Sequence, residues 1–267
     1  MTGERPPVAM TIAGTDSGGG AGVTADLKTF EAHGVWGTCA VVAVTAQNTI
    51  GVQAFQTLPA ALVQAQVRSV VADIGVDAAK TGMLASAELV VAVAEVWAEV
   101  RKPLVVDPVF VSKHGDTLLA NDAVAALTEQ LLPLATVVTP NLPEAAALTG
   151  IDITSRDEME EAAWRLSASG VGCVLVKGGH LGGATSPDLL WCDGKAVWLE
   201  AARIEGRHTH GTGCCLSAAV AAELARGMDP PDACVAAKRF VEHAIAGGLA
   251  IGAGVGPVNP GWARTAG

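Results

Sequence analysis

The 267-residue sequence predicts an α/β fold with a mostly parallel central sheet and helices on both faces. Short apolar runs rich in β-branched residues alternate with helical patterns of about 10–15 residues, and this alternation is typical of βαβ units. Half of the residues are apolar but only 4% are aromatic, which favours a core of Ala, Val and Leu with helices packed closely on the sheet. Because the alternation continues without a linker, a repeat or a low-complexity tract, we expect a single domain over residues 1–267.

The N-terminal part of the chain predicts a strand, a glycine-rich loop and a helix, followed by two more strands. The apolar run over 8–13 is the first strand, and the helical pattern over 23–33 ends before Gly34, a residue type that often follows a helix. The β-branched run over 38–47 predicts a buried strand. The alternating run over 52–57 predicts a strand with one exposed face.

The middle of the chain predicts three helices and one buried strand. Helical patterns cover about 60–72 and 86–100. The run "PLVVDP" then predicts the strand. Asn121 or Asp122 is expected to cap the third helix, because both side chains can accept hydrogen bonds from free backbone amides.

The C-terminal part predicts further strands and helices. The runs "TVVTP" and "CVLVKGG" are strand-like, and Ser155 with Glu158 forms a capping box for a helix that reaches Ser169. A hairpin and two helices close the chain. The expected hairpin strands are "LLWC" and "AVWLE".

Polar and glycine-bearing segments follow the expected strands with regularity. They read "AGTDSGGGAG", "TAQNT", "KTGM", "VDPVFVSKHGD", "TPNLPEA", "VKGGH" and "HTHGTGCC". In open α/β sheets the ligand lies outside the carboxyl ends of the strands. We therefore expect a phosphate-handling site where these segments meet.

Charge and composition argue against several classes of protein. The formal net charge of −10 argues against a nucleic-acid partner, which normally needs a basic face. The most apolar stretch, "LVVAVAEVWAEV", is interrupted by Glu95 and Glu99, so we expect an amphipathic helix there and no membrane association. The six cysteines form no CxxC pair and suggest neither a zinc site nor a disulfide framework. This cysteine pattern, with no recognisable signal peptide at the N-terminus, favours a reducing, cytoplasmic location.

The glycine-rich segments match no standard nucleotide-binding motif. The sequence contains no "GxxxxGK[ST]", and "GTDSGGGAG" lacks the full "GxGxxG" pattern, so neither a P-loop nor a dinucleotide fingerprint is present. This first glycine cluster is either a tight strand-to-helix turn or a place where a ligand approaches the backbone. The sequence leaves both alternatives open.

The segment "HGTGCC" opens an Ala-rich helix that ends at Gly227. Its glycines can turn the amides of residues 211–214 toward one point, where the helix N-terminus adds about half a positive charge. The same field should lower the pKa of the Cys214 thiol, which makes Cys214 a candidate base or nucleophile. Cys215 points about 100° further round the helix and is expected to pack. That both cysteines are structural remains the alternative.

Four charged residues follow strands and could handle a nucleotide. Asp107 and Glu144 together could hold Mg²⁺, which prefers a few carboxylates, waters and substrate phosphates. Glu144 alone could instead favour the first turn of a helix. Lys177 could clamp a phosphate or could be merely solvated, and Lys113 could act similarly.

Taken together, the segments resemble a known family over about Val8 to Pro257. "TIAGTDSGGGAGVTADLKTF", "TAQNT", "KTGML", "DPVFVSKHGDTLL", "TPNLPEAAALTG", "VLVKGGH" and "HTHGTGC" resemble, in the same order, hydroxymethylpyrimidine/phosphomethylpyrimidine kinase of thiamin biosynthesis. The resemblance implies a ribokinase-like fold. It also implies phosphorylation of 4-amino-5-hydroxymethyl-2-methylpyrimidine and then of its monophosphate, with ATP and Mg²⁺, and we expect a homodimer.

The resemblance also implies a pocket for the pyrimidine. Gln47 would hydrogen-bond the aminopyrimidine, and Gly14, Asp26 and Met83 would lie around the same pocket. The family often has Met where this chain has Phe110, a departure that could alter a lid over the substrate.

On the phosphate side, the resemblance implies an anion hole with a catalytic thiol. The anion hole would comprise Gly211, Thr212, Gly213 and Cys214. Cys214 stands where most ribokinase-like relatives carry an aspartate base, and the family usually has Thr in place of Cys215. Lys177 would face the ATP phosphates, and Asp107 and Glu144 would serve the metal region.

Two other functions compete with this interpretation. A pyridoxal or pyridoxine kinase can use the same scaffold and the same cysteine, and Gln47 could also read a pyridine ring that carries a hydroxyl. A non-catalytic sensor of vitamin precursors is a candidate from another class. The presence of Lys177, Asp107, Glu144 and Cys214 argues against a sensor, which need not keep them.

Overall fold

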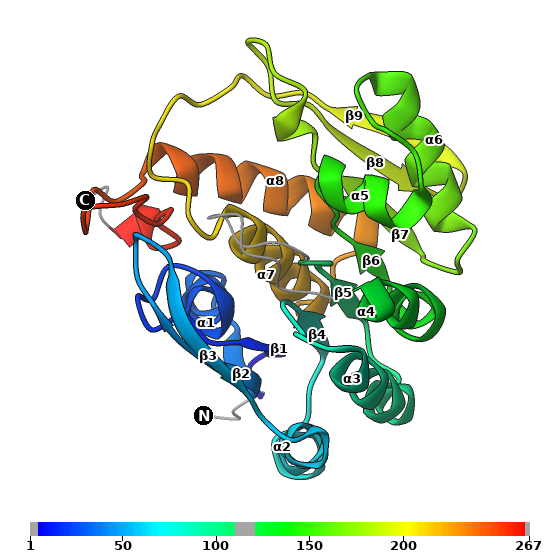
Figure 1. The fold of residues 1–267 in the computed structure, drawn as a ribbon, viewed down its shortest axis with the longest axis vertical. Helices are drawn as coiled ribbons and strands as arrows, with labels where there is room; N and C mark the ends of the chain where they lie inside the picture. The colour runs from blue at the N-terminus through cyan, green and yellow to red at the C-terminus, as the bar shows by residue number, and fades with distance from the viewer. Residues whose placement is uncertain (1–4, 110–120, 265–267) are drawn as a thin grey trace.

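The computed structural model describes residues 5–109 and 121–264, and its centre is a single twisted sheet (Figure 1). In this part of the chain the sheet has nine strands in the order β3-β2-β1-β4-β5-β6-β7-β8-β9. The strands are β1 Val8–Gly14, β2 Trp36–Gln47, β3 Val52–Thr57, β4 Ala78–Thr81, β5 Leu104–Val106, β6 Val137–Val138, β7 Cys173–Val176, β8 Asp188–Cys192 and β9 Lys195–Leu199. The pairs from β2 to β7 are parallel, and β3, β8 and β9 add antiparallel edges. The predicted fold class is confirmed.

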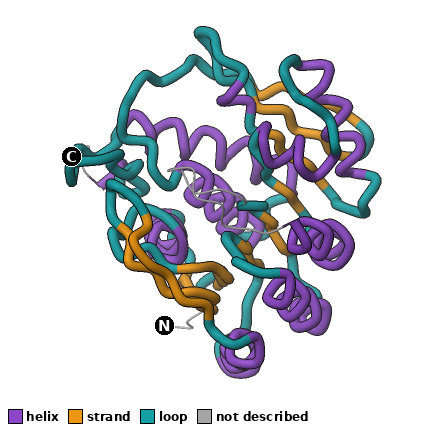
Figure 2. Tube along the Cα trace, in the orientation of Figure 1, coloured by secondary structure: helices purple, strands orange, loops and turns teal. Residues whose placement is uncertain are grey.

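Helices cover both faces of the sheet (Figures 1 and 2). The helices α1, α7 and α8 pack together on one face, and α2 to α6 lie on the other. Their bounds are α1 Gly22–Ala32, α2 Ala60–Asp73, α3 Ala87–Val100, α4 Asn121–Ala126, α5 Leu142–Thr149, α6 Arg156–Ser167, α7 Thr212–Ala225 and α8 Pro230–Ala246. After α4 the helix continues as a π-helical turn and a 3₁₀ turn to Leu134.

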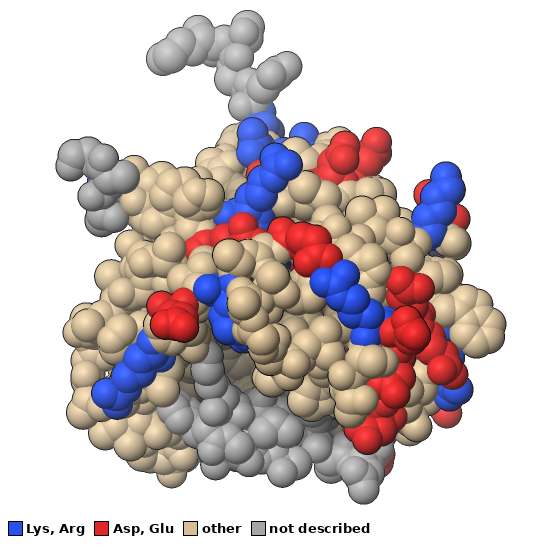
Figure 3. Space-filling view, turned by 90° about the horizontal axis from the view of Figure 1, so that it is seen from above, with Lys and Arg blue, Asp and Glu red and all other residues tan. Residues whose placement is uncertain are grey.

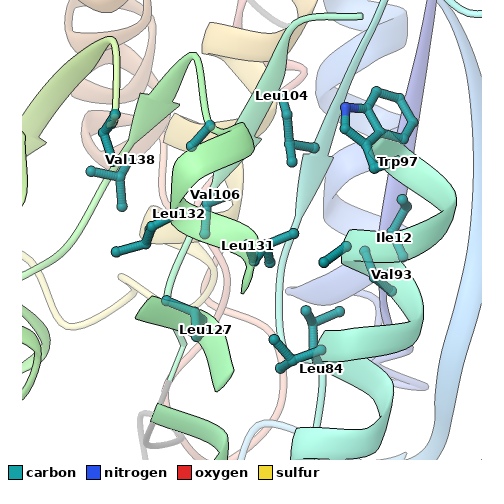
Figure 4. Packing of buried hydrophobic residues seen from close by; sticks show 14 of the residues in the cluster. Ile12, Leu84, Val93, Trp97, Leu104, Val106, Leu127, Leu131, Leu132 and Val138 are labelled. Atoms are coloured by element: carbon teal, nitrogen blue, oxygen red, sulfur yellow. The ribbon is translucent and has the colours of Figure 1, made fainter. Parts of the chain in front are cut away.

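Two hydrophobic clusters, one on each face of the sheet, form the core. Successive side chains of a strand point to opposite faces, so that Met10 and Ile12 of β1 enter one cluster and Ala9 enters the other. Figure 4 shows the first cluster, in which Trp97 of α3 packs near Leu104 of β5. The core is built largely from small aliphatic residues, as the composition predicted.

Several local predictions are confirmed and others need correction. The capping box of Ser155 and Glu158 is present, and Gly34 follows α1 with a φ of +70°. The segment "AAKTGM" contains β4, a strand in the centre of the sheet that the sequence did not predict, and the sequence indicated the helix α5 only through the possible helical first turn at Glu144. The helix α4 begins at Asn121, so Asp122 lies in its first turn.

The β2–β3 edge of the sheet is more exposed than predicted. The run over 38–47 was expected to be a buried strand, but β2 alternates between buried and more exposed positions. In β3 the residues from Gln53 to Thr57 are all exposed, although one buried face was expected. The physical reason is position, because β3 is the edge strand and pairs only with β2.

One disulfide contradicts the expectation drawn from cysteine spacing. Cys173 of β7 and Cys192 of β8 are bonded, with Cα atoms 4.6 Å apart. The antiparallel register places the two residues directly opposite each other. Spacing along the chain does not reveal this, because it depends on which strands pair. The other four cysteines are free thiols.

On the face shown in Figure 3, Lys and Arg side chains lie among Asp and Glu side chains and do not gather into one basic field. Among the residues that the structure describes, no helix combines the length and the apolar character needed to cross a bilayer.

Candidate active site

A cavity of about 860 Å³ opens at the carboxyl ends of the parallel strands. Loops after β1, β2, β4, β5, β6 and β7 line it, together with the N-terminus of α7. Ten of the predicted site residues meet here. They are Gly14, Gln47, Met83, Asp107, Glu144, Lys177, Gly211, Thr212, Gly213 and Cys214.

The N-terminus of α7 forms the middle of the cavity wall. Gly211 caps the helix with a φ of +80°, and a Cβ there would collide with the backbone oxygen of Gly20, so only glycine fits. A Cβ on Gly213 would lie 3.4 Å from Lys177 Nζ. The amide end of α7 and a lysine ammonium therefore face the same space, and both favour an anion.

The environment of Cys214 differs from the one predicted. Burial raises the pKa of its thiol to about 11, although the charge of Lys80 acts in the opposite direction. The expectation of a lowered pKa is wrong for the structure described, because burial outweighs the charge of Lys80 and the hydrogen bond from the Gly22 backbone. Cys215 is fully buried, as expected, and the thiol hydrogen-bonds Thr29.

Lys177 lies between two carboxylates. The ammonium Nζ is 3.0 Å from Asp107 Oδ1 and 3.6 Å from Glu144 Oε2. Burial lowers the pKa of Lys177, but the two carboxylates raise it more, so the pKa lies above its usual value. Lys177 is therefore positively charged and reaches the cavity, where it can meet a phosphate.

Glu144 has a structural task as well as a place in the cavity. A carboxylate oxygen of Glu144 accepts a hydrogen bond of 2.7 Å from the backbone N–H of Asn141, and the Asn141 side chain accepts one of 2.9 Å from the backbone N–H of Glu144. This capping box starts α5. Burial and the nearby Asp107 raise the pKa of Glu144 to about 7 against the effect of Lys177. Both interpretations of Glu144 from the sequence thus have a geometric basis.

Asp107 links Lys177 to further polar side chains. The oxygen Oδ1 accepts a hydrogen bond from Thr139 Oγ1 at 3.3 Å, and Oδ2 accepts one from Ser217 Oγ at 3.2 Å. Ser217 stands one turn into α7, so this bond ties the loop after β5 to the helix.

At the β1–β2 end of the cavity, Gln47 is held at the end of β2. Its backbone N–H donates to Ser17 Oγ at 2.8 Å, and the Ser17 hydroxyl donates to the Gln47 backbone oxygen at 2.7 Å. Gly14 and Met83 line the same end, and Met83 Cε approaches so closely that a Cβ on Gly14 would clash with it.

Asp26 does not line the cavity, in contrast to its predicted place in the pocket. It belongs to the buried face of α1 and is fully buried, because it lies one turn from Val23 and Phe30 on that face. Its Oδ2 accepts hydrogen bonds from Thr11 Oγ1 at 2.6 Å and from Lys80 Nζ at 3.0 Å. Asp26 is thus part of the support beneath the cavity.

Sequence reasoning missed Lys80, Asp16 and His210. Lys80 stands in "KTGM", which the sequence analysis noted as a polar segment, but it lies within β4 and not in a loop after a strand. Asp16 and His210 stand in "GTDSGGGAG" and "HTHGTGCC", and His210 Nε2 lies 2.8 Å from Asp16 Oδ2. Phe110 and Lys113, which the sequence also singled out, lie outside the described residues.

The opposite end of the cavity, at β8 and α8, combines charged and apolar side chains. Lys238 Nζ lies 2.9 Å from Asp188 Oδ2 and donates to the Ser186 backbone oxygen at 2.9 Å, which joins α8 to the segment before β8. The apolar side chains that line this end are Ala201, Ala202, Ile204, Val241 and Ile245. A flat, weakly polar group fits such a wall.

Comparisons with known proteins agree with this geometry. A family model described as phosphomethylpyrimidine kinase matches residues 16–259. A hydroxymethylpyrimidine/phosphomethylpyrimidine kinase of Streptomyces coelicolor is 54% identical over 97% of this chain and 96% of its own. One of Rhizobium meliloti is 50% identical over 94% of this chain and 96% of its own.

Solved structures are similar as well. The ADP complex of Bacillus subtilis pyridoxal kinase superposes with a TM-score of 0.91 and 39% identity, covering 97% of this chain and 99% of that chain. A phosphomethylpyrimidine kinase of Clostridium difficile superposes with a TM-score of 0.79 and 38% identity, covering 89% of this chain and 99% of that chain.

Proposed function

The chain belongs to the phosphomethylpyrimidine kinase family, and from this premise we propose the reaction and the roles of the site residues. The reaction is transfer of the γ-phosphoryl group of ATP to the alcohol of 4-amino-5-hydroxymethyl-2-methylpyrimidine, followed by a second transfer to the monophosphate, in thiamin biosynthesis. The family consists of kinases, so the sensor alternative is set aside.

One observation carries this proposal. Lys177 and the amide end of α7 face a common space between the β1–β2 end and the β8–α8 end of the cavity. We assign the β1–β2 end, with Gln47, Gly14 and Met83, to the pyrimidine. We assign the β8–α8 end to the base of ATP, so that the phosphates lie across the middle.

The chemistry requires positioning and charge neutralisation more than covalent help. The substrate oxygen attacks the γ-phosphorus, the bond to the bridging oxygen breaks, and ADP leaves. Lys177 and the amides of residues 211–214 would stabilise the charge on the transferred group. Cys214 would orient the alcohol or accept its proton, and its raised pKa supports orientation, because the thiol is protonated near neutral pH.

We propose that Mg²⁺ accompanies ATP. Asp107 and Glu144 offer the hard oxygen donors that Mg²⁺ prefers, but they are two carboxylates beside a lysine. Among the described residues no cluster of three or more metal-ligating side chains occurs. The donors therefore fit an ion that takes most of its ligands from phosphates and water, and the ion would supply neutralisation of phosphate charge.

A coupled assay of ADP release tests the function. The hydroxymethylpyrimidine and its monophosphate should both be phosphorylated, and Gln47→Leu should raise KM for the first by about 10–100-fold, because a buried partner is left unpaired. No turnover of either pyrimidine would refute the proposal. Pyridoxal belongs in the same assay, because solved pyridoxal kinases resemble this structure at 35–39% identity.

We also propose a homodimer that uses the exposed β2–β3 edge of the sheet. Trp36, Val44 and Phe55 of these two strands are all more than half exposed, and Phe55 also lines the cavity, so a second copy of the chain would cover the apolar edge and the adjoining part of the cavity. Light scattering should give the dimer mass, and Phe55→Glu should give the monomer mass. A single domain over residues 1–267 and a cytoplasmic location remain predictions.

A further inference from the structure

A buried pair, Asp16 and His210, lies against Gln47 at the β1–β2 end of the cavity. His210 Nε2 is 2.8 Å from Asp16 Oδ2 and 3.5 Å from Gln47 Nε2. All three side chains line the cavity, while Asp16 and His210 are themselves nearly inaccessible. The pair therefore contacts the one side chain to which we assign recognition of the pyrimidine.

Asp16 is an ionised acceptor. Its Oδ1 accepts a hydrogen bond from the Gly18 N–H at 2.8 Å, and Oδ2 accepts from the N–H groups of Gly20 at 3.1 Å and Ala21 at 2.9 Å. Burial raises the pKa of Asp16, but the hydrogen bond and charge of His210 and the backbone amides outweigh it, so the pKa lies below its usual value. Near neutral pH both oxygens can only accept.

The state of His210 Nε2 follows from this. Because Asp16 Oδ2 can only accept, the nitrogen 2.8 Å away must carry a hydrogen and donate it. Such a nitrogen has no lone pair for the N–H₂ group of Gln47. The two ends of an amide have the same shape, so hydrogen-bond chemistry decides its orientation. The N–H of His210 therefore directs Oε1 of Gln47 toward the ring. The Nε2 group of Gln47 is left to donate into the cavity.

Neighbouring groups hold His210 and Gln47 in place. The His210 backbone N–H donates to the Gly256 oxygen at 3.1 Å, and its oxygen accepts from the Val258 N–H at 3.0 Å. A Cβ on Gly20 would lie only 2.6 Å from His210 Cδ2, so the bare glycine allows the ring to approach. Ser17 holds the backbone of Gln47 on the other side.

We propose that the Asp16–His210 pair sets the polarity of the Gln47 amide and thereby determines which ring edge the site accepts. An acceptor nitrogen beside an amino group fits, because Gln47 Nε2 donates to the nitrogen and Oε1 accepts from the amino group. A ring with a 4-oxo group and an N3–H has donor and acceptor exchanged, so like groups would face each other. The inference rests on the proposed function, and it makes Asp16 and His210 positioning residues for substrate specificity.

The test compares two acceptors, the 4-amino ring and the 4-oxo ring of otherwise identical structure. The intact enzyme should favour the 4-amino ring in kcat/KM by at least about 100-fold, because mismatched buried polar groups are rejected strongly. In His210→Gln the new amide can accept as well as donate, so Gln47 can turn and the ratio should fall by about tenfold or more. His208→Gln is the matched control, since His208 bonds the Gly256 N–H outside the cavity lining, and its ratio should not change.

A second variant guards against misfolding. Asp16→Ala removes the acceptor that holds the hydrogen on His210 Nε2, so this nitrogen can instead accept from the Gln47 N–H₂ group, and the ratio should fall in the same direction. ADP binding at the far end of the cavity reports whether each variant is folded. If the ratio of kcat/KM for the two rings were unchanged in both folded variants, this inference would be overturned and the proposed function would stand. If the intact enzyme phosphorylates neither ring, the proposed function is wrong and the inference falls with it.

Discussion

Two lysine–carboxylate groups flank Cys214, and they differ in access to the cavity. Lys177 lies 3.0 Å from Asp107, with 16% of its side chain exposed at the cavity wall. Lys80 lies 3.0 Å from Asp26, and neither side chain has any exposed surface. Both lysines affect the electrostatics of the Cys214 thiol. The same pair of residue types is thus used once at the cavity and once beneath it.

The difference in burial separates two roles. Lys177 can exchange a carboxylate for a substrate phosphate, because the cavity reaches its ammonium. Lys80 cannot change partner without opening the core, so its charge is constant and acts only through space and through the position of Asp26. A substitution at Lys177 should therefore affect turnover, and one at Lys80 should affect stability first.

Lys80→Met is the strongest test of this contrast. Removing Lys80 leaves the Asp26 carboxylate buried without its cation, which should cost about 3–5 kcal/mol of unfolding free energy. The double variant Lys80→Met/Asp26→Asn should recover much of the loss, because no buried charge remains. Urea denaturation measures the unfolding free energy of the single and of the double variant. Equal stability of the single and double variants would mean that the pair is not coupled.

Lys177→Ala should separate turnover from stability. Loss of the charge at the cavity should lower kcat/KM for ATP by about 10²–10³-fold, as for other groups that stabilise a transition-state charge. Pyrimidine binding should change little, and the unfolding midpoint should fall less than in Lys80→Met, because the cavity gives solvent access beside Asp107 and Glu144. Lys195→Ala on the exposed strand β9 is the control and should behave like the parent. A parent-like ATP response of Lys177→Ala would remove the phosphate role.

The Cys214 thiol lies between the two lysine–carboxylate groups, and its reactivity reports whether it is protonated. With a pKa of about 11, its alkylation by iodoacetamide at pH 8 should be about 100-fold slower than for a thiol of ordinary pKa, which is close to 9. The rate should rise steadily as the pH increases toward 11. Cys215 should not react in the folded protein. Fast labelling of Cys214 at neutral pH would show a thiolate and restore the general-base role.

A comparison of the first and second phosphoryl transfers separately tests whether Cys214 acts as a base. If the thiol only orients the alcohol, Cys214→Ser should lower the first transfer by less than about tenfold, well below the 10²–10⁴ expected for a general base. A much larger fall in the first transfer than in the second would instead identify a base, since a phosphate acceptor needs none.

Glu144→Gln should have the smallest effect. Glutamine can still complete the capping box with Asn141, so stability should hardly change. Loss of the carboxylate should raise the Mg²⁺ concentration for half-maximal activity by no more than about tenfold. Because the pKa of Glu144 is about 7, the parent itself should need more Mg²⁺ as the pH falls through 7, whereas the variant should not. If the Mg²⁺ requirement of the parent and of the variant changed with pH in the same way, Glu144 would not contact the ion.

The sequence predicted the location of the site better than its electrostatics. Gln47, Lys177 and Asp107 follow strands, and the rule that parallel strands end at one edge was enough to bring them together. Asp26 was misplaced, because only packing shows which face of α1 is buried. The pKa of Cys214 was misjudged in direction, because the burial that raises it depends on tertiary packing.

Pairings between distant segments were also beyond the sequence. The bond between Cys173 and Cys192 depends on the register of β7 and β8, and the Asp16–His210 contact joins residues 194 positions apart. Neither leaves a periodic signal. The helix α5, by contrast, carried a recognisable capping box in Asn141 and Glu144, and closer attention to that pattern would have found it.

The backbone bonds of His210 to Gly256 and Val258 have a consequence for synthesis of the protein. The ring that faces Gln47 is held by residues that come long after β1 and β2, the strands that form the rest of that pocket and are made first. Domains fold progressively as the ribosome advances at about 5–20 residues per second. A nascent chain can therefore form most of its sheet, but its pocket is incomplete until Val258 has emerged, and proteolytic cleavage between His210 and Gly256 would inactivate an otherwise folded enzyme.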